Sequence, residues 1–101
     1  MKVFGSPLAN EEEIANKFPL RVFPNPTESE TTIEYDVVKK GRVNINIYDF
    51  TGKLLKTGLD EEKNINSYQV KLNIGNFNSG MYLVDYQLNG VHVESMRMLK
   101  K

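Results

Sequence analysis

The chain has 101 residues, of which 40% are hydrophobic and 26% are charged, a composition typical of an ordinary globular domain. This length allows one domain with a single modest core. Its 13 basic and 13 acidic residues cancel, which argues against nucleic acid or an anionic lipid surface as a partner. Cysteine is absent, so disulfides and thiolate-bound metals are excluded.

Residues 1–17 differ in character from the rest of the chain. Gly5-Ser6-Pro7 is a flexible opening, and an acidic run follows at 11–13. We interpret this stretch as a linker, because any helix starting at Asn10 would be too short to be stable without docking. The first nine residues lack the apolar core of a secretory signal peptide, so we expect any such signal to lie on a larger precursor. The folded domain is predicted to span residues 18–101.

From residue 20 onward, short runs of β-branched and aromatic residues alternate with polar ones, and Ile33, Tyr35 and Val37 are the clearest example. A period of two indicates strands with one buried face. It predicts strands over residues 20–23, 32–37, 43–47, 53–57, 68–74, 82–88 and 91–98. Asn89-Gly90 predicts a two-residue hairpin between the last two. About seven such strands indicate an all-β fold, an immunoglobulin-like antiparallel β-sandwich.

The segment Phe23-Pro24-Asn25-Pro26 is the most unusual local feature. Each proline fixes its own φ and pushes the preceding residue toward extended conformations, so a rigid, extended segment is predicted. Neither proline can donate a ladder hydrogen bond, so the segment should end or border a sheet. It is either a guard against wrong edge pairing or a preformed recognition element, and physical reasoning alone favours the guard.

Two further turns punctuate the strands. Residues 48–53 should form a hairpin loop, with Gly52 at a positive φ and Asp49 accepting hydrogen bonds from nearby backbone N–H groups. At the second turn, Gly80 should open the strand that carries Tyr82. This tyrosine is predicted to be a core or corner residue rather than a ligand contact.

The sequence offers little for catalysis. His92 is the one histidine and lies in a predicted strand, so a histidine metal cluster is excluded and a Ser-His-Asp site would need that ring to be accessible. The acidic run at 60–62 lacks the spacing of a calcium loop and is interpreted as a solvated loop. Phosphate-binding loops and nucleophile elbows are absent from the sequence. We therefore predict no enzyme activity, no catalytic or metal-binding residues, no cofactor and no small-molecule substrate.

The order of these motifs resembles the C-terminal sorting domain of cargo proteins exported by the type IX secretion system, over about residues 18–101. The matching segments are Phe23-Pro24-Asn25-Pro26, Thr32-Ile33-Glu34-Tyr35, Gly41 through Tyr48-Asp49 to Gly52-Lys53, Ser79-Gly80-Met81-Tyr82, and a hairpin at Gly90 with a basic tail. The chain departs from many members at Met96, where they carry a lysine, and has Arg97 beside it.

The resemblance implies a secretion signal that is recognised by the outer-membrane machinery of Bacteroidetes-type bacteria and carries an attached upstream cargo domain through the periplasm to the cell surface or the extracellular space. In the family, a sortase-like peptidase commonly removes the domain, and the cut here would fall in the linker before Phe18. The residues carried over as recognition residues are Pro24, Asn25, Pro26, Gly52, Gly80, Tyr82, Gly90, Lys100 and Lys101.

Two alternatives stay open from the sequence. Sandwiches of this kind often carry carbohydrate or protein sites on their end loops, so a binding or adhesion module is the second hypothesis. A hydrolase is a third, for which no catalytic constellation is visible. An unpaired edge strand would in addition allow self-association by strand addition.

Overall fold

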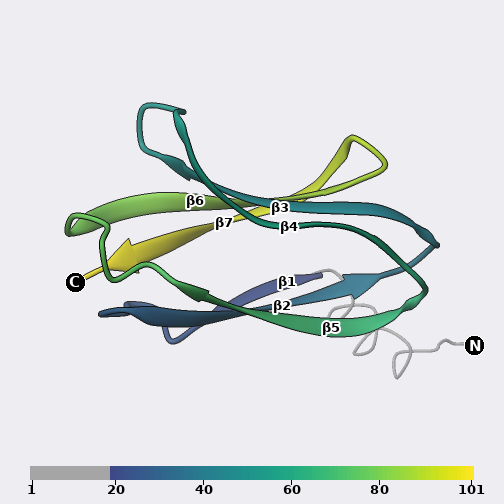
Figure 1. The fold of residues 1–101 in the computed structure, drawn as a ribbon, viewed down its shortest axis with the longest axis horizontal. Helices are drawn as coiled ribbons and strands as arrows, with labels where there is room; N and C mark the ends of the chain where they lie inside the picture. Colours follow the sequence, from purple (N-terminus) through teal and green to yellow (C-terminus); the bar gives the residue numbers. More distant parts are fainter. Residues whose placement is uncertain (1–18) are drawn as a thin grey trace, which may run out of the picture.

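The computed structural model describes residues 19–101, which form seven antiparallel strands in two packed sheets (Figure 1). The smaller sheet has the order β1-β2-β5, with β1 at Leu20–Phe23, β2 at Glu30–Val37 and β5 at Asn66–Asn73. The larger has the order β4-β3-β6-β7, with β3 at Gly41–Asp49, β4 at Leu54–Lys63, β6 at Gly80–Leu88 and β7 at Val91–Lys100. The predicted all-β sandwich is confirmed.

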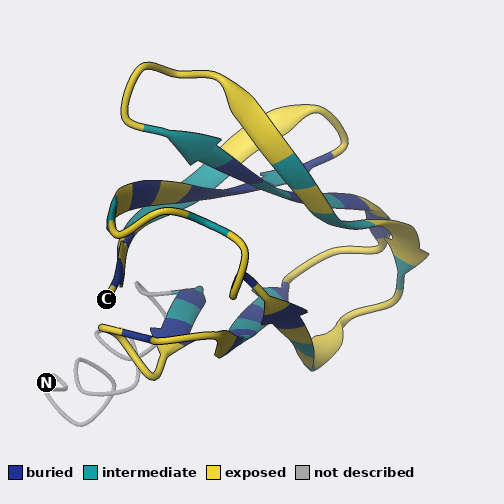
Figure 2. Cartoon of the chain, turned by 60° about the vertical axis from the view of Figure 1, so that its left-hand side comes forward, coloured by how far each residue is buried: buried dark blue, intermediate teal, exposed yellow. Residues whose placement is uncertain are grey.

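The core lies between the two sheets and is built from alternate residues of each strand (Figure 2). Ile33, Tyr35 and Val37 of β2 are at most 2% exposed, as the period of two predicts. On the facing sheet, Ile45 and Ile47 are fully buried. Each such side chain contributes about 1.5–3 kcal/mol by leaving water, so this alternation accounts for the packing of the two layers.

Three tyrosines link the sheets inside the core. The ring of Tyr35 stacks on Tyr68 with centroids 5.5 Å apart and meets Tyr86 edge-on at 5.7 Å. The Tyr86 hydroxyl, carried by β6, donates to the carbonyl of Asp36 on β2 at 2.8 Å. Burial raises the pKa of Tyr35 to about 12 and also raises the pKa of Tyr86, because a buried site disfavours the charged phenolate.

The predicted hairpin between β6 and β7 is present. Asn89 and Gly90 have φ values of 55° and 79°, the two positive values that a type I′ turn needs. Asn89 also ties this turn to the start of β3, since its Oδ1 accepts the Arg42 N–H at 2.9 Å. A Cβ at Gly41 would lie 2.5 Å from the Asn89 side chain, so this contact requires glycine there.

The acidic run at 60–62 is not the solvated loop that its composition predicted, because it lies within β4. β3 supplies a pairing partner along its whole length, and Arg42 on β3 forms an ion pair with Asp60 at 2.7 Å. Cross-strand pairing therefore overrides the weak local strand propensity of these residues. Within residues 19–101, no helix is long and apolar enough to cross a membrane.

Candidate recognition surface

The proline segment leaves β1 and turns toward the edge of the other sheet. The Phe23–Pro24 and Asn25–Pro26 peptide bonds are both cis, and residues 24–26 bend. The expectation of an extended segment is wrong, because the chain has to pass from β1 in the smaller sheet to the outer edge of β7 in the larger one. The expectation that it borders a sheet is met at β7.

Asn25 and Thr27 cap the last residues of β7. Asn25 Nδ2 donates to the carbonyl of Arg97 at 2.8 Å, and its Oδ1 accepts the N–H of Leu99 at 2.9 Å. Thr27 continues this pairing, since its N–H donates to Leu99 O at 2.9 Å and its carbonyl accepts the Lys101 N–H at 2.8 Å. We call this set of contacts the C-terminal clamp. It fills the outward-facing hydrogen-bonding groups at this end of an edge strand.

Two buried threonines hold the proline segment in place. Thr27 is 2% exposed and its hydroxyl donates to Glu30 O at 2.7 Å. Thr31 is fully buried and its hydroxyl donates to Pro24 O at 3.2 Å. Sequence reasoning missed both residues. The one available signal was that threonine hydroxyls close to a turn tend to bond nearby backbone groups.

Most of the sequence-predicted recognition residues meet at one end of the sandwich. Gly80 opens β6 as predicted and pairs with Lys100 on β7, so it lies beside the clamp. Tyr82 follows it, 8% exposed, with its hydroxyl bonded to Asn78 O at 2.5 Å, which is the geometry of a corner tyrosine. Gly90 does not join them, because it lies at the other end of β7, a strand of ten residues and about 30 Å.

The two terminal lysines have different environments. Lys100 is 9% exposed, and its Nζ donates to the Lys101 carbonyl at 2.9 Å. The Lys101 side chain, just after β7, is exposed, as is that of Arg97 on β7. The accessible positive charge of the basic end therefore belongs to Arg97 and Lys101.

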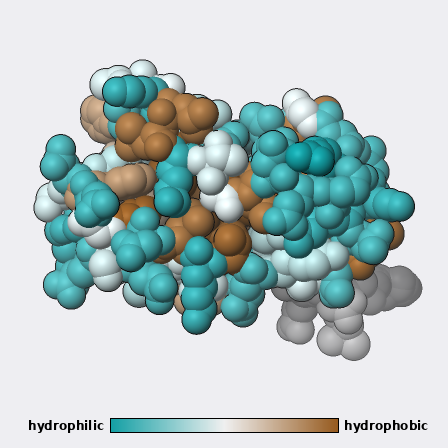
Figure 3. All heavy atoms as spheres, in the orientation of Figure 1, coloured by the Kyte–Doolittle hydropathy of each residue, from teal (hydrophilic) through white to brown (hydrophobic). Residues whose placement is uncertain are grey.

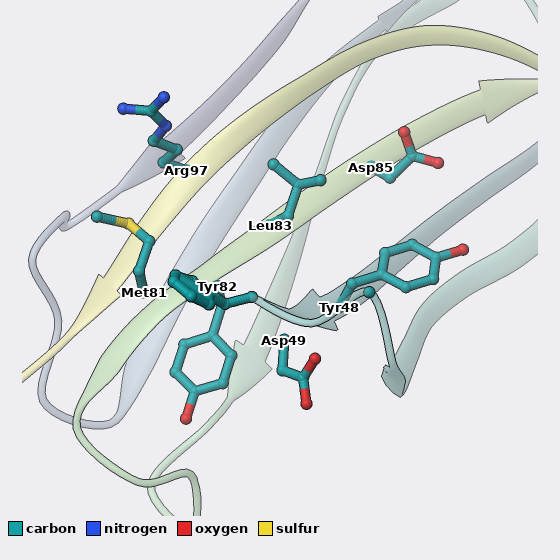
Figure 4. Close-up of a pocket in the computed structure, with 9 residues that line it drawn as sticks. Tyr48, Asp49, Met81, Tyr82, Leu83, Asp85 and Arg97 are labelled. Atoms are coloured by element: carbon teal, nitrogen blue, oxygen red, sulfur yellow. The ribbon is translucent and has the colours of Figure 1, made fainter.

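The loop between β3 and β4 rises above the larger sheet (Figure 1), and an open groove of about 690 Å³ lies beside it, lined in part by β6 and β7 (Figure 4). Gly52 has a φ of 91°, as predicted. Asp49 Oδ1 accepts the N–H groups of Thr51 at 2.8 Å and Lys53 at 3.0 Å. Hydrogen bonds from Thr51 and Lys53 lower the pKa of the Asp49 carboxyl. The groove is lined by Tyr48, Asp49, Phe50, Gly52, Met81, Tyr82, Leu83, Asp85 and Arg97.

His92, Ser95 and Asp85 form a polar cluster on β6 and β7. The Ser95 hydroxyl donates to Asp85 Oδ1 at 3.0 Å, and His92 Nε2 lies 2.9 Å from Ser95 Oγ and 3.3 Å from Asp85 Oδ1. The same ring nitrogen, Nε2, thus faces both the serine and the carboxylate. A catalytic base would instead accept the serine proton at one nitrogen and use its other nitrogen for the carboxylate. The cluster therefore fits a cross-strand polar network. Among residues 19–101 there is also no group of three or more side chains placed to hold a metal ion.

The fold and these surfaces define a class: a small β-sandwich with most of its motif residues at one end and on one outer face. Residues 21–100 match the model of the secretion system C-terminal sorting domain, and the chain belongs to this family. The domain is thus a type IX secretion signal, a non-catalytic element that directs cargo export across the outer membrane and is recognised by the secretion machinery. The resemblance in motif order is confirmed. No curated protein matches the chain.

Proposed function

We propose that the outer-membrane export machinery recognises this domain at the C-terminal clamp. A sortase-like peptidase then cuts the chain within residues 1–17. The cargo is thereby left at the cell surface or in the extracellular space. The observation that carries the proposal is the pair of hydrogen bonds from Asn25 to β7, which join residues 72 and 74 positions apart. A receptor that contacts both segments therefore binds only the folded domain.

Exposure and chain geometry support both parts of this proposal. Pro24, Asn25, Pro26 and Lys101 are all exposed beside one another, so one partner surface can reach them. Within the described residues the first strand starts at Leu20, so a cut within residues 1–17, which lie outside this range, removes none of the seven described strands. The linker from the cargo and the folded signal are accordingly separable.

Recognition is tested by fusing a periplasmic reporter ahead of the whole chain in a cell with an active type IX system. Asn25→Ala should reduce export, because it loses both contacts to β7. Asn76→Ala is the matched control, since it removes an exposed asparagine from the loop before β6. Lys101→Ala keeps the main-chain contacts of the clamp and should reduce export through charge alone. Normal export of both Asn25→Ala and Lys101→Ala would contradict recognition at the clamp.

Cleavage is tested by mass spectrometry of the exported reporter. The expected product ends within residues 1–17, and immunodetection should find it on the cell surface or in the medium. An exported reporter that still carries residues 18–101 would contradict removal of the domain.

A further inference from the structure

The outer face of the larger sheet carries an apolar floor beneath the loop between β3 and β4. Strand register places Tyr48, Leu83 and Arg97 in one row across β3, β6 and β7, and Met81 lies in the next row. Leu83 and Met81 are 38% and 40% exposed, so this apolar floor is accessible to a partner. Figure 4 shows these residues on their three strands.

The loop adds an apolar overhang to this floor. Phe50, at the tip of the loop, is 78% exposed. Figure 3 shows apolar atoms both on the lobe at the upper left, where Figure 1 places this loop, and on the surface beneath it. The volume of about 690 Å³ lies within the range of about 300–1,000 Å³ that is usual for binding sites.

The charges of the groove indicate what it would bind. Both carboxylates are already engaged: Asp49 by its loop, and Asp85 by Ser95 and Gln87. Arg97 is the one cation in the lining, and its guanidinium makes no hydrogen bond or ion pair with any residue of the described range 19–101. An occupant that fits the groove therefore brings an apolar side chain for the floor and a carboxylate for Arg97.

The groove is also connected to the clamp. Asn25 Nδ2 donates a hydrogen bond to the carbonyl of Arg97, so it fixes the backbone that carries this cation. Gly52 permits the turn of the overhanging loop, and Tyr82 lies between Met81 and Leu83 on the floor strand. Motif residues from separate parts of the chain thus shape one groove.

We propose that this groove binds a loop of the export machinery that presents an aromatic or aliphatic side chain next to an aspartate or glutamate. The apolar side chain packs on Leu83 and Met81 beneath Phe50, and the carboxylate pairs with the Arg97 guanidinium. This inference rests on the proposed function, because it names a second contact surface for the same machinery.

The first experiment measures export of the reporter fused to the whole chain. Arg97→Glu should lower export about ten-fold or more, because it places two like charges in a desolvated contact. Leu83→Ser should lower it by removing the apolar floor. The matched controls are Lys39→Glu in the turn after β2 and Val91→Ser, which change exposed residues outside the groove lining and should export normally. Thermal unfolding of each purified chain verifies that it is folded.

The second experiment titrates the purified chain with two blocked tripeptides, Gly-Phe-Asp and Gly-Phe-Asn, and follows backbone amide shifts by NMR. Saturable shifts at Leu83 and Arg97 are expected, with several-fold weaker binding of the neutral peptide and of the acidic peptide to Arg97→Glu.

The outcomes separate this inference from the proposed function. If the wild-type fusion is exported and both Arg97→Glu and Leu83→Ser are exported equally well, the groove inference is overturned and the proposed function stands. If Asn25→Ala and Lys101→Ala export normally while the groove variants fail, recognition at the clamp is overturned and the groove stands. Absence of saturable shifts at Leu83 and Arg97, or equal affinity for the two peptides, overturns the groove inference whatever the export result.

Discussion

The two edges of the larger sheet are protected by different means. At β4, Glu61 and Lys63 form an ion pair at 3.2 Å, and the Lys63 ammonium lies 4.8 Å from the ring centroid of Tyr68, which packs against the core. Charges that point inward on an edge strand oppose pairing with another chain. At β7, the protection is a piece of the same chain, because Asn25 and Thr27 occupy the outward hydrogen-bonding groups of its last residues.

An edge strand can therefore be protected in two ways. Charges only oppose association with another chain, whereas hydrogen bonds from the same chain also stabilise the fold. The charges of β4 add little to stability, since exposed ion pairs are weak. The clamp at β7 adds hydrogen bonds between segments at opposite ends of the domain sequence. We therefore expect damage at β7 to lower the free energy of unfolding and damage at β4 to change the oligomeric state.

The largest effect is expected from deleting residues 99–101. The deletion removes the Leu99 and Lys101 backbone partners of Asn25 and Thr27, and the buried stem of Lys100. The three clamp hydrogen bonds at about 1 kcal/mol each predict a loss of at least about 3 kcal/mol in the free energy of unfolding, measured by urea denaturation. The lost pairing of Leu99 and Lys100 with β6 adds to this loss. Lys101→Ala retains the backbone contacts and serves as the control. A truncated chain as stable as this control would mean that the clamp does not stabilise the fold.

A smaller effect on the free energy of unfolding is expected at alkaline pH, where the buried Tyr35 ionises near the inward-facing Glu61 of β4. The pKa of Tyr35 is raised to about 12, first by burial and then by the negative charge of Glu61. The unfolded chain loses this proton near its ordinary pKa of about 10, whereas the folded chain keeps it, so the folded state binds more protons between these values. The free energy of unfolding therefore falls as pH rises from about 10 to 12, by at most about 1.4 kcal/mol per pH unit for this group.

Tyr35→Phe separates this contribution from that of Tyr86, whose pKa is also raised by burial. Its unfolding free energy, measured by urea denaturation between pH 9.5 and 11.5, should fall less steeply than that of the wild type. Parallel slopes for the two chains would contradict a raised pKa at Tyr35. Glu61→Gln should give an intermediate slope, because it removes only the second cause of the shift.

The contrast between the edges also explains what the sequence could and could not predict. Alternation and turn residues depend on neighbours in the chain, so the strand of Ile33 and the turns at Gly52 and Asn89-Gly90 were predictable. The partner of Asn25 lies 72 residues away, so its flanking prolines indicated a restricted backbone and a bordered sheet but not which strand it caps. The groove was missed for the same reason, since Tyr48, Leu83 and Arg97 share a face only through pairing of distant strands. The acidic part of β4 was misinterpreted because its strand form depends on β3.

The smallest effect on stability is expected from Glu61→Thr combined with Glu62→Thr, which tests whether charge protects the β4 edge. Threonine suits a strand, so the free energy of unfolding should change little, but the edge loses two charges that oppose pairing with a second copy. Sedimentation velocity should show a dimer whose fraction increases with protein concentration. Glu28→Thr with Glu30→Thr is the matched control, because it removes the same charge from the first residue of β2 and from the bend before it, away from the edge strand β4, and should stay monomeric. If both double variants associate equally, net charge rather than the guard at β4 keeps the chains apart, and the two edges differ less than their contacts indicate.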